Sequence, residues 1–466
     1  MNNRKYILSG ISQVTCVNLF SMLVTAVLTL IIPKYISPLN YGLWQLFVFY
    51  QGYLGFFHLG WNDGLYLRYG GCDYSSLNKK SFYSQFWGLI LFEGIIGVLL
   101  LLIFNSTVQE DIPRKYIMWQ LIINMIILNS RYMLLYILQA TARIKEYAII
   151  LWIDRFAYIS IIAILLGAQN VSYKGFILAE TYSKAIAYGF AIYYCKDIIF
   201  YKVSKFYIDF KEIKENIVVG SKILFANIAS ILIMGICRLG IERNWGIEIF
   251  GEVSLTITLS QLFITFITNV GMILFPILKR MDKNSLIRTY SILKIGLCCF
   301  VPFVLIWFYP GSLLLKKWLP AYKNSIKFMG LLLPICFYES KMALINTTYL
   351  KAMRKEKQLM IINVWIMILS LFFTGVFSYL FKNLIMSISA ITVLLALRCI
   401  WAEKTVCDRL EIKKNVVLNI ENILMLIFVI TNYFISGWSG FTLYAGIAIM
   451  FVTFNVKIFY KENIKK

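Results

Sequence analysis

Charged side chains lie inside strongly apolar stretches of this sequence, and they are the strongest candidates for a functional site. A charge at the centre of a membrane helix costs roughly 2.5–3.5 kcal/mol, so few of them can face lipid. They must face one another or water, as in a transporter with a polar pathway. Basic residues outnumber acidic ones among the candidates, which are Glu93, Arg131, Asp154, Arg155, Glu180, Lys184, Arg238, Glu339, Lys341 and Arg398.

Some buried charges have ordinary structural explanations. Glu180 and Lys184 are four residues apart, so they lie on one helix face and can pair locally. A structural pair and a functional pair both fit this spacing. Three lysines near predicted helix ends are expected to extend toward the lipid headgroups. They are Lys222, Lys294 and Lys327.

A second polar group follows the second apolar stretch and includes the only histidine. It comprises His58, Asn62, Asp63 and Arg68, with Gly55, Gly60 and Gly64 interspersed. The glycines permit close backbone approach or bending. His58 and Asp63 match the HxxxxD pattern of some acyltransferases, but on a continuous helix they would lie about 140° apart. We therefore predict no catalytic residue.

The composition indicates an integral membrane protein. Hydrophobic residues make up 60% of the 466 residues and charged residues only 15%, against roughly a quarter in soluble proteins. The net charge of +23 is spread over short loops, which argues against nucleic-acid binding. The nine cysteines show no CxxC spacing, so we expect neither a metal site nor disulfides.

Fourteen apolar stretches are long enough to cross a bilayer, which needs about 20 residues. Pro302 and Pro334 fall inside two of these predicted helices and are expected to kink them. The predicted helices span residues 7–32, 43–62, 82–104, 117–139, 147–167, 175–195, 217–241, 249–277, 288–309, 325–350, 359–381, 383–402, 415–436 and 439–458.

The distribution of Lys and Arg predicts the orientation. With the N-terminus in the cytoplasm, the cytoplasmic segments hold 28 basic residues and the outer segments nine. This bias favours an even number of helices with both termini inside. The first apolar run is too long for a signal peptide, so the first helix is expected to be retained.

The helix order suggests two bundles of six. We predict a first bundle with its connector at residues 1–216, a second at 217–414 and an additional helix pair at 415–466. The sequence Asn40 to Leu46 is echoed by Ile249 to Leu255, each with an aromatic-Gly-x-x-x-Leu pattern. Two six-helix halves share one orientation, as in transporters with parallel repeats.

This chain resembles the Wzx-type flippases of lipid-linked oligosaccharides. That family belongs to the superfamily of the MATE drug exporters and the lipid II flippases. The resemblance rests on the run IIPKYISPLNYGLWQLFVFYQGYLGFFHLGWNDGLYLRYGG at residues 31–71, on the echo at 249–255 and on the 6+6+2 layout.

The resemblance implies alternating access of a cavity between two bundles. The cargo would be a polyprenyl-pyrophosphate-linked oligosaccharide, such as an O-antigen, capsule or exopolysaccharide unit, crossing the bacterial inner membrane. Arg presents a fork of donors suited to phosphate oxygens. The predicted cavity residues are Arg131, Arg155, Arg238, Lys341 and Arg398.

The acids Glu93, Asp154, Glu180 and Glu339 would neutralise these cations or couple transport to H⁺ or Na⁺, and we favour neutralisation. No other cofactor is implied. Besides the lipid-linked oligosaccharide and membrane lipids, other polysaccharide-assembly proteins are conceivable partners, whereas nucleic acid is not.

Three alternatives remain open. A drug or metabolite antiporter on the same fold would favour acidic residues, whereas basic ones predominate here. A polysaccharide polymerase or ligase would need a larger outer loop than the predicted 105–116 and 310–324. A structural protein without transport would leave the buried charges unexplained.

Overall fold

The computed structural model describes residues 2–107, 111–168, 171–201, 207–412, 417–435 and 437–464. Within these ranges the chain is helical and contains no strand. It divides into two compact units, Met1–Ile228 and Ala229–Lys466, here called unit 1 and unit 2. The predicted all-α architecture is confirmed. The predicted boundaries at 216 and 414 stay predictions.

Nine helices in the described part of the chain are long and apolar enough to cross a membrane. A tenth span results if the pair Pro320–Leu332 and Ile335–Ala352, bent by 47°, counts as one. The helix Phe210–Leu278 has 69 residues, far beyond the roughly 20 that one span needs. Every predicted range overlaps a described helix, while the count of fourteen and the orientation stay predictions. Six basic residues used for that orientation, Lys202, Lys205, Lys413, Lys414, Lys465 and Lys466, lie outside the described residues.

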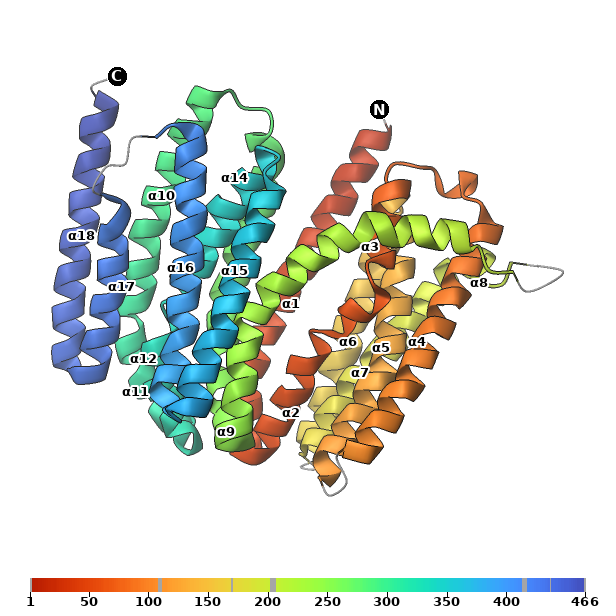
Figure 1. The fold of residues 1–466 in the computed structure, drawn as a ribbon, viewed down its shortest axis with the longest axis horizontal. Coiled ribbons are helices and arrows are strands. Elements are labelled where there is room, and N and C mark those ends of the chain that lie inside the picture. Colours follow the sequence, from red (N-terminus) through yellow and green to blue (C-terminus); the bar gives the residue numbers. More distant parts are fainter. Residues whose placement is uncertain are drawn as a thin grey trace. The chain divides into compact units, whose positions relative to one another are not determined.

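Unit 1 is organised around α5 (Figure 1). In its most apolar stretch 67% of the residues are buried, against 28% in α4 and 17% in α6. It packs against α3, α4, α6 and α7, so polar groups on α5 face protein rather than lipid. The elements of unit 1 are α1 (Asn2–Tyr35), α2 (Pro38–Gln51), η1 (Leu54–His58), α3 (Trp61–Tyr69), η2 (Tyr74–Ser76), α4 (Lys79–Thr107), α5 (Ile112–Ala140), α6 (Ile144–Gly167), α7 (Tyr173–Tyr194), α8 (Lys196–Ile199) and the first part of α9 (Phe210–Leu278).

The predicted helix 43–62 is not continuous, which corrects the sequence-based expectation. The chain leaves α2 at Gln51, passes through the short helix η1 and restarts as α3 at Trp61. Leu59 and Gly60 between them have left-handed backbone angles, with φ of 53° and 86°. That conformation is unstrained for glycine only, so Gly60 allows the break.

Glycines bring α3 and α9 into backbone contact within unit 1. A Cβ added to Gly220 would lie 1.9 Å from the carbonyl oxygen of Gly60. A Cβ added to Gly64 would lie 1.8 Å from the carbonyl oxygen of Asn216. Small residues at such spacing let membrane helices approach closely. The close approach expected of these glycines is confirmed, and it fixes the start of α9 on unit 1.

Several helix starts are set by side-chain caps. Ser37 and Pro38 begin α2, and Asp111 accepts a hydrogen bond from the Arg114 backbone at the start of α5. Ser172 and Asn383 cap α7 and α16 in the same way. Such residues satisfy amide groups that have no partner inside the helix. The apolar stretches therefore begin where the sequence supplies caps.

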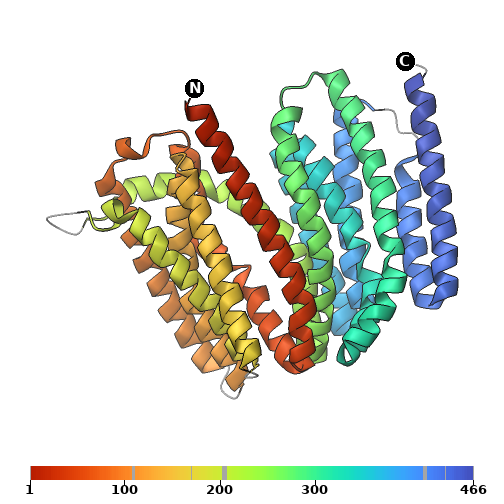
Figure 2. The same cartoon turned by 180° about the vertical axis from the view of Figure 1, so that it is seen from behind.

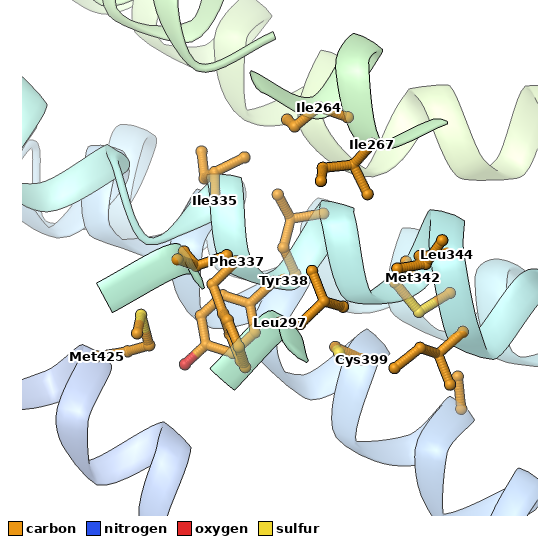
Figure 3. Packing of buried hydrophobic residues seen from close by; sticks show 14 of the residues in the cluster. Ile264, Ile267, Leu297, Ile335, Phe337, Tyr338, Met342, Leu344, Cys399 and Met425 are labelled. Carbon is orange, nitrogen blue, oxygen red and sulfur yellow. The ribbon is translucent and has the colours of Figure 1, made fainter. Parts of the chain in front are cut away.

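Unit 2 carries the larger hydrophobic core. Figure 3 shows Leu297 of α10, Phe337 and Tyr338 of α13 and Met425 of α17 within it. The helices α17 and α18 lie side by side (Figure 2). The elements of unit 2 are the rest of α9, then α10 (Lys283–Ile306), α11 (Phe308–Trp318), η3 (Pro320–Tyr322), α12 (Lys323–Leu332), α13 (Ile335–Lys341), η4 (Met342–Asn346), α14 (Thr347–Ala352), α15 (Glu356–Thr374), η5 (Gly375–Leu380), α16 (Leu384–Leu410), α17 (Val417–Phe434) and α18 (Trp438–Ile464).

The predicted helix 325–350 is also interrupted. It bends between α12 and α13, at Pro334, where a proline removes a backbone hydrogen bond. A π-helical turn, η4, follows directly after Lys341. Both π-helical turns and prolines distort helices locally. The bend expected at Pro334 is confirmed, and Lys341, at the end of α13, is buried within unit 2.

Candidate functional site

Five charged residues from three helices form the first candidate site, here called the unit 1 charge cluster. The Nη1 atom of Arg131 on α5 lies 2.8 Å from the Oδ2 atom of Asp154 on α6, and both side chains are buried. On α7, Lys184 Nζ lies 2.6 Å from Glu180 Oε1, as the four-residue spacing predicts. The fifth member is Arg155, next to Asp154 on α6. The cluster thus contains three cations and two anions.

Arg155 carries the surplus positive charge of this cluster. Its side chain is half-buried, and within the described ranges it makes no hydrogen bond or ion pair. The charges of Arg155 and Lys184 both act on Asp154, which Arg131 already neutralises. A guanidinium at this depth is costly without an anionic partner. The geometry therefore leaves the guanidinium N–H donors of Arg155 available to an anion.

Glu93 is a buried acid without a cation. Its side chain is fully buried on α4, and its Oε1 atom accepts a hydrogen bond of 2.7 Å from Asn129 Nδ2. The same amide nitrogen donates to the carbonyl of Leu54 at the start of η1. Three buried acceptors there have no hydrogen-bond donor among the residues described: Glu93 Oε2, Asn129 Oδ1 and Asn62 Oδ1. A site with surplus acceptors suits a proton or a cation.

The second candidate site, the unit 2 charge cluster, is formed by Lys294, Lys341, Glu403 and Glu421. Lys341 Nζ donates to Glu403 Oε2 at 2.6 Å and also contacts Glu421 Oε1. Lys294 Nζ lies 2.9 Å from Glu403 Oε1. All four side chains are at most 10% exposed. The cluster joins α10, α13, α16 and α17 and has equal numbers of positive and negative charges.

Neighbouring polar groups complete this cluster. Tyr290 donates to Glu403 at 2.8 Å, and the Cys298 thiol donates to Glu421 at 2.9 Å. Every charged atom is therefore paired within the unit. The expectation that Lys294 extends to the headgroups is wrong, because Glu403 holds it in the core. In this structure Lys341 has two anionic partners of its own, which leaves it less free for a phosphate than Arg155.

Sequence reasoning missed Glu403 and Glu421. Glu403 lies one residue beyond the predicted end of helix 383–402, so it was assigned to a loop. Glu421 lies inside the predicted helix 415–436 but is not among the predicted site residues. An unpaired lysine at a helix centre is costly, so the sequence indicates that Lys341 needs an acidic partner. That requirement could have pointed to Glu403 and Glu421.

Arg398 and Glu339 form a third pair, within unit 2. Arg398 donates to Glu339 at 2.9 Å, to Asn363 at 2.9 Å and to Ser230 at 2.7 Å. Its guanidinium links α9, α13, α15 and α16. In this structure these contacts use all three guanidinium nitrogens, which resembles a structural cross-link.

Arg238 lies before the interruption of α9 at Gly246, which has a φ of 81°. It donates to Ser254 at 2.8 Å and lies over the ring of Phe250 at 5.1 Å. The break lets Arg238 meet residues that follow it by only 12 to 16 positions. It belongs to none of the three ion-paired groups described above.

The polar end of the second predicted helix divides into two parts. His58 Nε2 lies 3.9 Å from Asp63 Oδ2, which corrects the expectation that the two residues diverge on a continuous helix. The break at Gly60 brings them together, although 3.9 Å is beyond hydrogen-bond distance. The other ring nitrogen, Nδ1, accepts from the Gly60 amide. Asn62 Nδ2 donates to the carbonyl of Asn129 on α5.

Arg68 anchors the start of α9. It donates to Glu212, Glu215 and Asn216, each at 2.7 Å. These contacts hold α3 against α9. Of the predicted basic residues, the structure thus brings Arg131 and Arg155 into one cluster, whereas Arg238, Lys341 and Arg398 belong to separate networks.

The fold of this chain is similar to that of solved membrane transporters. No protein-family model matches the sequence, and no curated protein does either. The lipid II flippase MurJ in an inward closed conformation is similar, with a TM-score of 0.66 and 13% identity over 97% of this chain and 99% of MurJ. An inward-facing multidrug resistance MATE transporter is similar with a TM-score of 0.59 and 10% identity, over 84% of this chain and 96% of that protein.

An outward-facing MATE transporter is also similar, with a TM-score of 0.51 and 10% identity over 88% of this chain and 97% of the transporter. The chain therefore has the fold shared by MATE transporters and the MurJ flippase.

Proposed function

We propose that this protein is a flippase for a polyprenyl-pyrophosphate-linked oligosaccharide. The cargo would be an O-antigen, capsule or exopolysaccharide unit, moved from the cytoplasmic to the outer leaflet of a bacterial inner membrane by alternating access. A shared fold does not define a function, so the site must carry the argument. The fold supplies the context, because the likeness to a lipid flippase takes in 97% of the chain.

The observation that carries the proposal is the surplus positive charge of the unit 1 charge cluster. Arg131 pairs with Asp154, and Lys184 pairs with Glu180. Arg155 is the one cation of the cluster that has no ion pair among the described residues. A pyrophosphate carries about two negative charges, and Arg binds phosphate oxygens with two parallel hydrogen bonds. A half-buried Arg that makes no ion pair with the described residues is therefore a suitable anchor for such a headgroup.

Deleting the gene in its host tests the function. If the proposal is correct, complete lipid-linked repeat units accumulate in the cytoplasmic leaflet and surface polymer is lost. Repeat units that still reach the outer leaflet would contradict it and favour a polymerase or ligase. Normal polymer with increased drug sensitivity would instead indicate a drug antiporter.

We also propose that Glu93 is the acid that couples transport to an ion. Asp154, Glu180 and Glu339 each have a basic partner within 3 Å, so they act as neutralising groups. Glu93 has only an amide donor. Gaining a proton or Na⁺ would remove the cost of its isolated charge, and losing the ion would restore it.

Transport driven by imposed gradients in proteoliposomes tests this role. With Glu93→Gln the response to a pH or Na⁺ gradient is expected to vanish, because the amide cannot ionise. The control is Glu356→Gln, an exposed acid at the start of α15. Gradient-driven transport that survives in Glu93→Gln would rule out this assignment, and separate pH and Na⁺ gradients identify the ion.

A further inference from the structure

Unit 2 contains a cavity that neither charge cluster reaches. Its volume is about 700 Å³, and it lies between α11, α12, α17 and α18. A neighbouring cavity of about 550 Å³ shares Lys327, Phe328 and Ile385 with it. Volumes of this order are typical of sites for small organic ligands.

Aromatic side chains build one wall of the larger cavity. The ring of Tyr309 packs 6.1 Å from Phe441, and Phe441 packs 5.6 Å from Trp438. The Tyr309 hydroxyl is held by Thr431 and Asn432, at 2.8 and 3.2 Å. The wall is therefore fixed in place and presents apolar ring faces, a surface suited to an acyl chain.

Basic side chains stand at the same cavity. Lys316 on α11 and Lys323 and Lys327 on α12 line it, and all three are exposed. They form no ion pair with any residue in the described ranges, and no Asp or Glu is among the lining residues. Three ammonium groups beside an apolar wall complement a ligand with a phosphate and a hydrocarbon chain.

The predicted topology makes these lysines unusual. It assigns Lys316 and Lys323 to the outer side of the membrane, where basic residues are disfavoured. Only nine basic residues fall on that side, and Lys382, which lines the neighbouring cavity, is another of them. A binding role for their charge accounts for this concentration at one place.

We propose that this cavity binds an anionic glycerophospholipid of the surrounding membrane. Its phosphate would be held by Lys316, Lys323 and Lys327, and an acyl chain would lie along Tyr309 and Phe441. An anionic lipid is preferred to a zwitterionic one because its headgroup brings no ammonium group to repel the lysines. This site is independent of the proposed transport function.

Lipid retention by the purified protein tests the site. The full chain is placed in nanodiscs containing equal amounts of phosphatidylglycerol and phosphatidylcholine, and the lipids that stay bound after extraction are identified by native mass spectrometry. The wild type is expected to retain phosphatidylglycerol over phosphatidylcholine by about ten-fold. The triple variant Lys316→Gln, Lys323→Gln, Lys327→Gln is expected to lose this preference.

A second triple variant controls for charge. Lys279→Gln, Lys351→Gln, Lys357→Gln removes the same charge from exposed lysines of unit 2 that line neither cavity. It is expected to keep the wild-type preference. Equal retention of both lipids by the wild type, or an equal loss in both triple variants, would overturn the proposal.

A variant without charge change covers the case in which the first triple variant fails to fold. Ile385 lines both cavities and is 42% exposed, so Ile385→Trp fills space without removing a buried contact. Retention of phosphatidylglycerol is expected to fall several-fold. Unchanged retention would refute the cavity as the site. Adding polyprenyl phosphate to the nanodiscs distinguishes the source, because its preferential retention would contradict a membrane phospholipid.

Discussion

The two charge clusters differ in their charge balance. In unit 2, Lys294 and Lys341 face Glu403 and Glu421, and the charges balance. In unit 1, Arg131 pairs with Asp154, whereas Arg155 makes no ion pair with the described residues. Glu93, elsewhere in the same unit, accepts a hydrogen bond from an amide but has no cationic partner there. Balanced networks stabilise or specify a fold, whereas an unbalanced buried charge is a cost that folding alone does not explain. We therefore propose a structural role for the unit 2 charge cluster and ligand binding for the unit 1 charge cluster.

The largest expected effect comes from removing Lys341. Lys341→Gln leaves Glu421 without its nearest cation and Glu403 with only Lys294. Breaking a buried ion pair in this way costs about 3–5 kcal/mol. Unfolding of the purified protein, followed by fluorescence in denaturing detergent, measures the loss. Lys351→Gln, at an exposed position, is the control and should leave stability unchanged.

A double variant separates charge balance from packing. Lys341→Met with Glu421→Leu removes one charge of each sign and leaves Lys294 paired with Glu403. Most of the lost stability is expected to return, because a replaced ion pair is often neutral. A double variant as unstable as Lys341→Gln would show that the cluster is not a balanced structural network.

A smaller effect is expected from Arg131→Gln in unit 1. Asp154 loses its charged hydrogen bond, worth about 1.5–3 kcal/mol. The remaining charges of Arg155 and Lys184 still act on Asp154, so the loss should stay below that of Lys341→Gln. The same unfolding measurement compares the two variants. An equal or greater loss for Arg131→Gln would remove the contrast between the units.

The smallest of the three effects concerns the glycines that join α3 and α9. Gly220→Ala places a methyl group against the Gly60 backbone, and overpacking of this kind costs about 1–3 kcal/mol. Gly94→Ala on α4 meets no atom within 4 Å and serves as the matched control. If both variants unfold alike, unit 1 does not depend on this backbone contact.

The helices could be predicted from the sequence, whereas their interruptions largely could not. Apolar length alone placed each predicted range over a described helix, because the bilayer demands about 20 residues per span. It did not predict α8, and it left most of α3 and α11 in loops. The sequence left the break at Leu59 and Gly60 open, since glycines there permit either bending or close approach of an intact helix. The bend at Pro334 was predictable because proline cannot donate the missing hydrogen bond.

The candidate site was predictable only in part. The cost of burying charge identified Arg155 and Lys341, but not which of them has a partner. Pairing between helices depends on their packing: Lys341 meets Glu421 80 residues away in sequence. Only the local pair of Glu180 and Lys184 could be paired from its spacing.

The central claim is that Arg155 binds the anionic headgroup of the cargo. The direct measurement is the leaflet distribution of lipid-linked repeat units in the deletion strain complemented with Arg155→Gln, at equal protein level and thermal stability. Arg409→Gln, at an exposed position in the last turn of α16, is the control. We expect at least about ten-fold slower translocation for Arg155→Gln, equivalent to about 1.4 kcal/mol, and a wild-type rate for Arg409→Gln. Wild-type translocation by a stable Arg155→Gln protein would contradict this claim.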